Sequence, residues 1–405
     1  MVSDLGGHDA SPQFGVARRA VRLQPLEICY GLAMGSCRSV APLRPNRSCG
    51  PREALEGVMR RALLRPPCLV SFSGGLDSSA LLALATAVAR REGLADPVPA
   101  TLVFPGSAES DELEWQELIL RHLGLDDWIR LSFTDELDAV GPVAQRALTR
   151  HGLLWPFNLH FHLPIIEAAA GGTVVTGFGG DELGRSSASL YAERAIARRR
   201  VAGPRGGVHL AYRLSPRPVR FLRELVRRHD LRQRFPYLTA KARWQLQFAL
   251  VREHTHPFGW GPLLRRWLWR SRYFQVCRAN FDALASHDDV AMTHPFVEPS
   301  VLSSLGENGR YAGLGGRKEL LDTLMGDLLP PQFLNRTTKG TYSVPLWTEK
   351  ATRFAASWSG SGLDTSLVDP EAVRAAWLSE GRSVMSTTML QAAWLADNPV
   401  VGERR

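Results

Sequence analysis

The sequence predicts an α/β protein: a parallel sheet flanked by helices, followed by a largely helical C-terminal half. Two observations support this expectation. Between residues 51 and 185, short apolar segments alternate with longer segments of helical spacing, the pattern of a parallel sheet covered on both faces. Beyond Arg185 no comparable strand signal appears, and helical spacing returns in residues 266–285. The 405 residues suffice for two to three compact units.

The first predicted series is helix, strand, tight turn and helix. Residues 51–64 have apolar side chains at helical spacing, with Pro51 first and acidic residues early, as is typical of a helix start. Residues 68–72 form an apolar strand that ends at a Ser-Gly-Gly turn. Ser78 then opens a helix with basic residues in its last turn, where they complement the helix dipole.

Three more strands are expected in the same half of the chain. They are residues 97–104, 128–133 and 173–178, and a helix over 111–124 ending at Gly124 separates the first two.

Ligands of parallel sheets bind at the carboxyl ends of the strands. We therefore expect the loops after Phe72, Phe104 and Phe178 to converge on a binding site.

Three segments follow from this pattern. Residues 1–50 mix Gly, Pro, Ser and Arg and predict an N-terminal arm or remnant sub-domain. Residues 51–190 predict the half that holds the sheet, and residues 191–405 the helical half. Within the latter, residues 266–285 predict one helix, and residues 194–234 are crowded with Arg. This Arg-rich stretch is interpreted either as a solvated helix face or as a docking surface for an acidic peptide or partner protein.

Composition narrows the class of protein. The chain has 49 Lys and Arg against 40 Asp and Glu, and its net charge of +9 favours an anionic partner such as a nucleotide, nucleic acid, lipid headgroup or acidic peptide. Five cysteines without CxxC spacing argue against a disulfide framework and a zinc ribbon. The N-terminus does not resemble a signal peptide, and no apolar run reaches membrane-spanning length. We expect a cytoplasmic protein without a membrane span.

A glycine-rich loop follows the first strand. It reads Ser73-Gly-Gly-Leu-Asp-Ser-Ser, and its glycines, hydroxyls and helix N-terminus suit a bound anion. The loop lacks the Gly-Lys-Ser/Thr of a Walker motif, and it resembles the pyrophosphate loop (PP-loop) of ATP-pyrophosphatases, which adenylate a substrate. The resemblance implies ATP binding and Asp77 as a ligand of Mg²⁺. A plain glycine turn capped by Asp77 is the alternative. The expected nucleotide-binding residues of this region are Ser71, Ser73, Gly74, Gly75, Leu76, Asp77, Ser78 and Phe104.

A second loop ends the fourth predicted strand. Its sequence, Thr-Gly-Phe-Gly-Gly-Asp-Glu-Leu from Thr176, matches a motif of the asparagine-synthetase-like amide synthetases. That resemblance implies that Asp181 shares Mg²⁺ with the first loop, and that Gly177, Gly179 and Gly180 contact the nucleotide. A glycine hairpin is the alternative.

A third similarity lies near the C-terminus. Lys318-Glu-Leu-Leu, Asp327-Leu-Leu-Pro and Arg336-Thr-Thr-Lys-Gly occur in the order found in that family. There the lysine closes over the phosphates and stabilises developing charge. The resemblance therefore implies Lys339 and Arg336 as catalytic residues, whereas without it Lys339 is an exposed lysine on a loop.

The resemblance runs from about residue 53 to 350, with informative departures. Val2 stands where asparagine synthetases carry the glutaminase cysteine, so we expect a truncated N-terminal region without a functional glutaminase. Glu298 replaces the usual Asp of a Pro-Phe-Leu-Asp segment, and Ala291 stands where these enzymes place a catalytic Glu. The general base is then missing unless Asp288 or Asp289 takes its place.

The branch that fits best is the lasso-peptide cyclases, because Tyr342 follows the Arg336 motif. The resemblance implies closure of a macrolactam ring in a ribosomal precursor peptide. Such an enzyme would work with a leader peptidase and a leader-binding protein. Alternatives are a small-molecule amide or β-lactam synthetase, a tRNA-modifying PP-loop enzyme and a non-catalytic nucleotide-binding partner subunit. A nucleic-acid partner is not expected, because the paired cysteines of thiolating enzymes are absent.

Several aromatic residues have simpler interpretations. His160 and His162 alternate, but no third metal ligand is nearby, so we interpret them as structural. Residues 156–158 are a possible part of the substrate pocket. Five tryptophans are interpreted as core or interface residues rather than a stacking platform: Trp115, Trp128, Trp155, Trp267 and Trp269.

Overall fold

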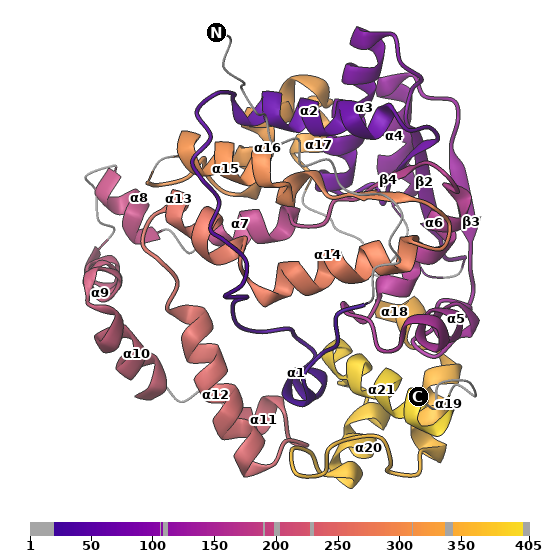
Figure 1. The fold of residues 1–405 in the computed structure, drawn as a ribbon, viewed down its shortest axis with the longest axis vertical. Helices are drawn as coiled ribbons and strands as arrows, with labels where there is room; N and C mark the ends of the chain where they lie inside the picture. Colours follow the sequence, from indigo (N-terminus) through magenta and orange to yellow (C-terminus); the bar gives the residue numbers. More distant parts are fainter. Residues whose placement is uncertain are drawn as a thin grey trace, which may run out of the picture.

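A parallel sheet organises the molecule (Figure 1). The computed structural model describes residues 20–105, 107, 112–188, 191–197, 203–226, 231–309, 311–336 and 343–399. Within these residues five strands form one sheet, in the order β3-β2-β1-β4-β5, and every neighbouring pair is parallel. The strands are β1 Cys68–Ser71, β2 Val98–Val103, β3 Ile129–Ser132, β4 Thr173–Val175 and β5 Ala291–Thr293.

The first strands and helices confirm the predicted series. α2 spans Pro51–Leu63, α3 Leu76–Glu92 and α4 Leu113–Leu123. α2 begins with Pro at its first position, and α4 is capped by Gly124, whose φ of 59° is the left-handed conformation that favours glycine. α3 begins two residues earlier than predicted, because Gly75 is its N-cap.

Two predictions about the later chain are wrong. β5 was not predicted, because it has only three residues; its pairing with β4, from Thr173–Ala291 to Val175–Thr293, defines it. The helix expected over 266–285 is divided into a π-helical segment, Leu263–Leu268, and α14, Arg272–Ala285. Ser271 separates the two, because its side chain accepts a hydrogen bond from the Phe274 N–H and caps α14.

Most of the remaining described chain is helical. Its α-helices are α1 Pro25–Tyr30, α5 Pro142–His151, α6 Leu163–Ala168, α7 Gly180–Ala188, α8 Tyr191–Ala197, α9 Gly203–Leu214, α10 Arg217–Val226, α11 Leu231–Arg234, α12 Ala240–His254, α13 Trp260–Pro262, α15 Pro299–Asn308, α16 Arg317–Met325, α17 Pro331–Leu334, α18 Ser343–Leu346, α19 Glu349–Ser357, α20 Pro370–Leu378 and α21 Thr387–Asp397.

The sheet separates two buried clusters. Alternate residues of β1 point to opposite faces, so that Val70 packs with residues of α2, α3 and α4, whereas Leu69 packs with residues of α5 and α6. This double coverage explains why the central strands β1 and β4 are short apolar runs, whereas β3 at the edge of the sheet alternates in burial.

The first described residues pack against the second half of the chain. Leu23, Cys29 and Tyr30 are buried. Glu27 accepts hydrogen bonds from Arg272 at the start of α14, at 2.5 and 2.9 Å. The part of the predicted N-terminal arm that the structure describes is therefore attached to the body of the molecule.

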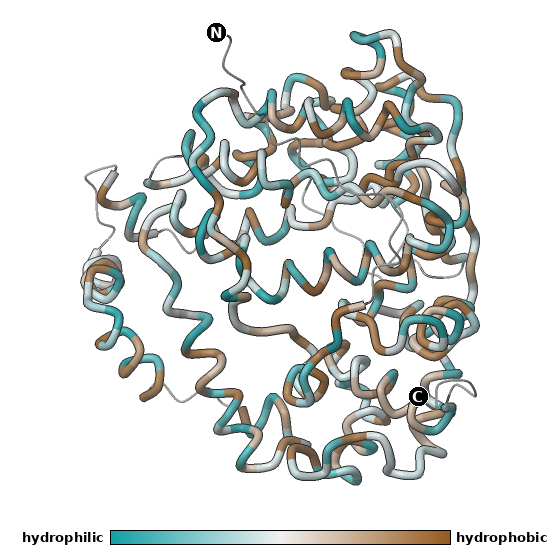
Figure 2. Tube along the Cα trace, viewed as in Figure 1, coloured by the Kyte–Doolittle hydropathy of each residue, from teal (hydrophilic) through white to brown (hydrophobic). Residues whose placement is uncertain are grey.

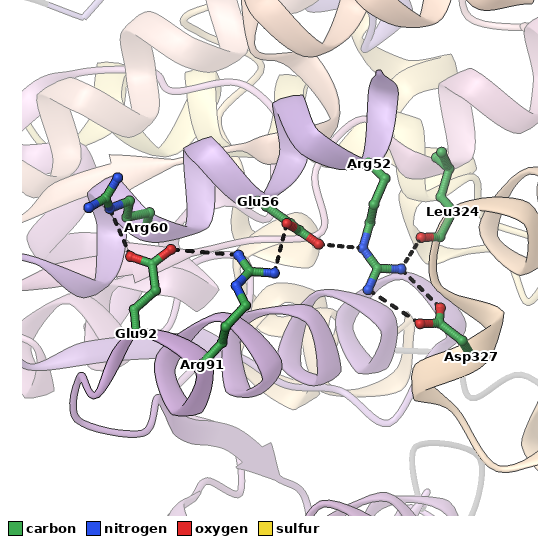
Figure 3. Close-up of polar contacts among 7 residues, drawn as sticks. All are labelled: Arg52, Glu56, Arg60, Arg91, Glu92, Leu324 and Asp327. Carbon is green, nitrogen blue, oxygen red and sulfur yellow. Dashed lines mark hydrogen bonds and ion pairs between the residues drawn. The ribbon is translucent and has the colours of Figure 1, made fainter. Parts of the chain in front are cut away.

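A charged network on the surface joins α2, α3 and the segment after α16 (Figure 3). Glu56 of α2 accepts from Arg52 and from Arg91 of α3, at 2.8 and 2.9 Å. Arg52 also donates to Asp327, and Glu92 pairs with Arg60 and Arg91. Exposed pairs of this kind contribute little individually.

Other expectations about single residues agree with the structure. All five cysteines lie in the described residues and are free thiols. None of the described helices combines the length and apolar character needed to cross a bilayer. Trp155 donates to the Gly31 carbonyl at 3.1 Å and Trp128 to Thr101 at 2.9 Å, so both belong to packed regions. The other three tryptophans are also packed, Trp115 against Phe333, Trp267 beside His256, and Trp269 with a hydrogen bond to Ala41.

Candidate active site

The glycine-rich loop after β1 turns sharply into α3. Gly74 has a φ of 78°, and a Cβ atom there would lie 2.8 Å from Gln116 Cγ of α4, so both the conformation and the space require glycine. The Ser73 and Ser78 hydroxyls are 3.2 Å apart, and Gln116 donates to the Ser73 carbonyl at 3.2 Å. Two hydroxyls and the first N–H groups of α3 therefore gather at the carboxyl end of β1, where an anion can bind.

The second loop lies directly against the first. A Cβ atom on Gly180 would be 2.4 Å from Asp77 Cγ, and one on Gly177 would be 3.3 Å from Asp77 Cβ. Gly179 has a φ of 96° beside Val297. The glycines of this loop thus allow the start of α7 to touch the Asp77 carboxylate, and the two predicted motifs are brought together.

Arg317, the first residue of α16, connects the two predicted metal ligands. Its guanidinium donates to Asp77 at 3.0 and 2.5 Å and pairs with Asp181 at 2.8 Å. Burial works against the charge of Arg317, but the carboxylates of Asp77, Asp181 and Glu182 outweigh burial and raise its pKa. Asp77 and Asp181 therefore converge on one point that holds positive charge.

The donor set at this point suits Mg²⁺. Two carboxylates from neighbouring loops face the same place, and hard cations prefer carboxylate oxygen. The described residues contain no group of three or more His, Cys, Asp or Glu side chains that could enclose a metal ion. A site with two carboxylates fits Mg²⁺ in particular, because that ion usually completes its shell with water and substrate phosphates.

The guanidinium of Arg336 contacts the backbone of the first loop. It donates to the Gly74 carbonyl at 2.6 Å, pairs with Glu112, and lies over the Trp115 ring at 4.8 Å. Its side chain is only 6% exposed. In this arrangement Arg336 holds the backbone of the phosphate loop at Gly74. Lys339 and Tyr342 lie outside the described residues.

An aromatic cluster borders the second loop. The Tyr273 hydroxyl donates to Glu182 at 2.5 Å, and its ring stacks on Phe178 and meets Trp155 edge-on. Glu182 follows Asp181 directly, so this cluster fixes the first turn of α7.

His294, after β5, supports the same loop. Its Nδ1 lies 2.7 Å from Thr176 Oγ1, and no residue that the structure describes forms a hydrogen bond with its buried Nε2. Burial, together with Arg278 and His162, holds the pKa of His294 well below its usual range, so the ring is neutral. Glu298 faces Arg278 at 3.8 Å.

Other predicted residues have different positions. Ser71 ends β1 and Leu76 begins α3, both beside the loop. The Phe104 ring is buried against Phe161, so only its backbone lies at the strand end. His160 bonds to the Leu137 carbonyl at 3.0 Å, in agreement with a structural role. The Phe157 carbonyl accepts from Gln391.

The structure also places the alternatives for the general base. Ala291 begins β5 opposite Thr173, at the end of the sheet away from the phosphate loop. Asp289 pairs there with Arg65 at 2.9 Å, and its side chain is 81% exposed. Asp288 precedes it in the same turn, and its carbonyl accepts from the Gly171 N–H. These residues do not reach the carboxyl edge where the two loops meet.

Sequence reasoning missed Arg317, Glu112 and Tyr273. One signal for Arg317 was present, because a cation at the first position of a helix is unfavourable to the helix dipole and needs another explanation. For Glu112 and Tyr273 no sequence signal existed, since their partners are distant in the chain.

Comparison with known proteins agrees with this geometry. The family model described as asparagine synthase matches residues 52–396, which is most of the chain. No match to a curated protein is found. The matched region contains the parallel sheet, both glycine loops and the Arg336 segment. The chain therefore belongs to the asparagine synthase family, whose members are ATP-dependent, AMP-forming carbon–nitrogen ligases.

Proposed function

We propose that this ligase closes a macrolactam ring in a ribosomal precursor peptide. The bond would join the N-terminal amine of the core peptide to an Asp or Glu side chain. The side-chain carboxylate attacks the α-phosphorus of ATP, forming an acyl-adenylate and releasing pyrophosphate. The amine then attacks the acyl carbon, AMP leaves, and the released pyrophosphate accepts the amine proton.

The two loops supply the residues for the first step. Ser73, Ser78 and the N–H groups at the start of α3 would bind the phosphates. Asp77 and Asp181 would hold Mg²⁺, which when bound neutralises charge on the departing pyrophosphate. Arg317 occupies the same point in the free protein, so it would have to give up at least part of this contact. Lys339 would stabilise the charge that develops in the transition state.

One observation carries the choice of substrate: no acidic side chain stands at Ala291, and Asp289 is held by Arg65. A synthetase that uses a free, small nucleophile needs a base to deprotonate it. An amine that belongs to the same folded peptide as the acyl group reacts at high effective concentration, so proximity supplies much of the rate. A missing base is therefore tolerable for ring closure.

Mass spectrometry of candidate precursor peptides tests the proposal. Each peptide is incubated with enzyme, ATP and Mg²⁺, and ring closure removes the mass of one water and blocks the N-terminal amine. Peptides with an acetylated N-terminus, or with the acceptor Asp or Glu changed to Ala, should stay unmodified. AMP, not ADP, should appear in equal amount to the product.

A second candidate, a small-molecule amide or β-lactam synthetase, is an outcome of the same experiment. If the peptides stay inert while a free amino acid is amidated or cyclised, the macrolactam proposal is wrong. Release of ADP would contradict adenylation itself.

A further inference from the structure

Helix α10 buries two of its charged side chains and exposes three aliphatic ones. Arg220 and Glu224 are only 5% and 4% exposed, whereas Val219, Leu222 and Val226 are 51%, 60% and 78% exposed. The three aliphatic residues are spaced as one helical stripe. Figure 2 shows apolar residues along α10, and Figure 1 places this helix at the outer edge of the molecule.

Several contacts fix this orientation. Arg220 donates to the His256 carbonyl at 3.2 Å, and the Gln247 side chain of α12 donates to the Glu224 carbonyl at 3.3 Å. Phe221 meets Phe248 of α12 with ring centroids 6.2 Å apart. The exposed stripe is therefore part of a packed helix pair and not of a loosely attached segment.

The apolar surface continues onto α12. Trp244 and Phe248 are 59% and 36% exposed and their rings lie 5.1 Å apart. Phe221 connects them to α10. We call these five residues, Val219, Leu222, Val226, Trp244 and Phe248, the apolar face. Exposed apolar side chains gathered in this way on two packed helices indicate an interaction site.

The positive charge of the chain is concentrated in the segment that carries this face. Residues 203–254 contain twelve Arg and Lys against three Asp and Glu, a net charge of +9, which equals the net charge of the whole chain. Arg252 follows Phe248 by one helical turn, and Arg217 and Arg223 belong to α10. Of the Arg-rich stretch, Arg198, Arg199, Arg200, Arg227 and Arg228 lie outside the described residues. Among the residues that the structure describes, no carboxylate forms an ion pair with Arg217, Arg223, Arg232, Arg234, Lys241 or Arg252.

These features select among possible occupants. A symmetric pair of copies would place two segments of +9 against each other, which like-charge repulsion disfavours. A membrane surface with anionic headgroups would attract the same cations, and vesicle flotation distinguishes it from a protein partner. An amphipathic helix from a partner, with apolar residues one turn apart and acidic residues beside them, matches both the stripe and the charge.

We propose that the apolar face and its surrounding cations form the docking surface for an acidic, amphipathic helical segment of a partner protein. The proposal goes beyond the ligase reaction and does not depend on which substrate is cyclised. The partner's apolar side chains cover the stripe, and its carboxylates pair with the surrounding Arg and Lys side chains.

A selection from a displayed library of random 16-residue peptides tests this proposal. The library is selected on the full chain and, in parallel, on a surface variant with Val219→Ser, Leu222→Gln and Val226→Ser. A matched control carries Leu378→Gln and Val384→Ser, which are 43% and 40% exposed elsewhere. Unchanged thermal unfolding and ATP binding show that each variant is folded.

We expect peptides with net negative charge and apolar residues at helical spacing to be enriched on the wild type and the control. One enriched peptide is synthesised and its Kd is measured by fluorescence anisotropy. The Kd should be at least about tenfold higher for the surface variant than for the wild type. Binding should also weaken with Arg217→Glu and Arg252→Glu, but not with Arg150→Glu on α5, and should weaken as salt rises.

The other occupants give different results. Equal enrichment on the wild type and the surface variant, or enrichment of neutral or basic peptides, overturns the proposal. Flotation with phosphatidylserine vesicles that depends on the apolar face, without selected acidic peptides, assigns the face to a membrane. Dimers that the surface variant abolishes assign it to a second copy.

Discussion

The phosphate-loop region and the Arg-rich helices both bury charged side chains, but the arrangements differ. At the sheet edge two carboxylates, Asp77 and Asp181, converge on one guanidinium between glycine-lined loops. In the helices, Glu193 of α8 and Arg213 of α9 form a one-to-one pair at 2.6 Å, with side chains 0% and 4% exposed. The difference teaches that burial of an ion pair does not identify an active site. An active site is indicated instead by an excess of like charge around a point that a ligand can reach.

The largest expected effect tests the converging carboxylates. Asp77→Ala should lower AMP formation by about a thousandfold, because the proposed ligand of Mg²⁺ and the partner of Arg317 are lost together. Calorimetry should show ATP binding that no longer depends on Mg²⁺. Asp327→Ala, which removes a 67% exposed partner of Arg52, is the matched control and should keep full turnover. Full turnover of Asp77→Ala would show that the converging carboxylates do not take part in the reaction.

The one-to-one pair should affect stability instead of turnover. Arg213→Met leaves the Glu193 carboxylate buried without its partner, and we expect a loss of about 3–5 kcal/mol in the free energy of unfolding. The double variant with Glu193→Gln should recover most of this loss in chemical denaturation. Turnover per folded molecule should not change, and a lowered turnover would place this pair in the catalytic machinery.

Lys339→Ala tests whether Lys339 acts in the transition state or only binds the phosphates. We expect kcat to fall by about a hundredfold while the Kd for ATP changes little, since the interaction belongs to the transition state. Lys350→Ala, which removes the partner of Asp135, is the control. Equal losses in binding and rate would make Lys339 a plain phosphate contact.

Buried histidines that are kept neutral should make the protein sensitive to acid, and His160 is one of three in the described part of the chain, with His162 and His294. Burial lowers the pKa of His160 from its usual 6.5 to about 4. Below pH 6.5 this histidine binds a proton in the unfolded chain but stays neutral in the folded protein. The free energy of unfolding therefore falls as the pH falls towards 4, by up to about 1.4 kcal/mol per pH unit. His160→Gln can still donate to the Leu137 carbonyl and should flatten this slope in denaturation measured at several pH values. An unchanged slope would assign the acid sensitivity to other groups.

The smallest effect belongs to the surface network of Figure 3. Glu56→Ala removes the shared partner of Arg52 and Arg91, and we expect a loss below about 1 kcal/mol, because both ion pairs lie at the surface, where water can take the place of the carboxylate. Thermal and chemical unfolding measure it. A loss as large as that of Arg213→Met would mean that burial does not separate the two kinds of pair.

The part of the site that could be predicted is local in the chain. The Ser-Gly-Gly turn between β1 and α3 follows from an apolar run, glycines and a helix start within about 25 residues. The motif at Thr176 is equally compact. Arg317 is 240 residues from Asp77, and nothing in either segment indicates the other.

The sequence alone determined the class of fold, the two glycine loops and the family resemblance, because each rests on periodicity or spacing within a short segment. Tertiary structure decided the rest. The three residues of β5 become a strand only by pairing with β4, and the stripe on α10 faces outward only because Arg220 and Glu224 are held inside. Helical spacing specifies that a helix has two faces, but the surrounding helices determine which face is buried.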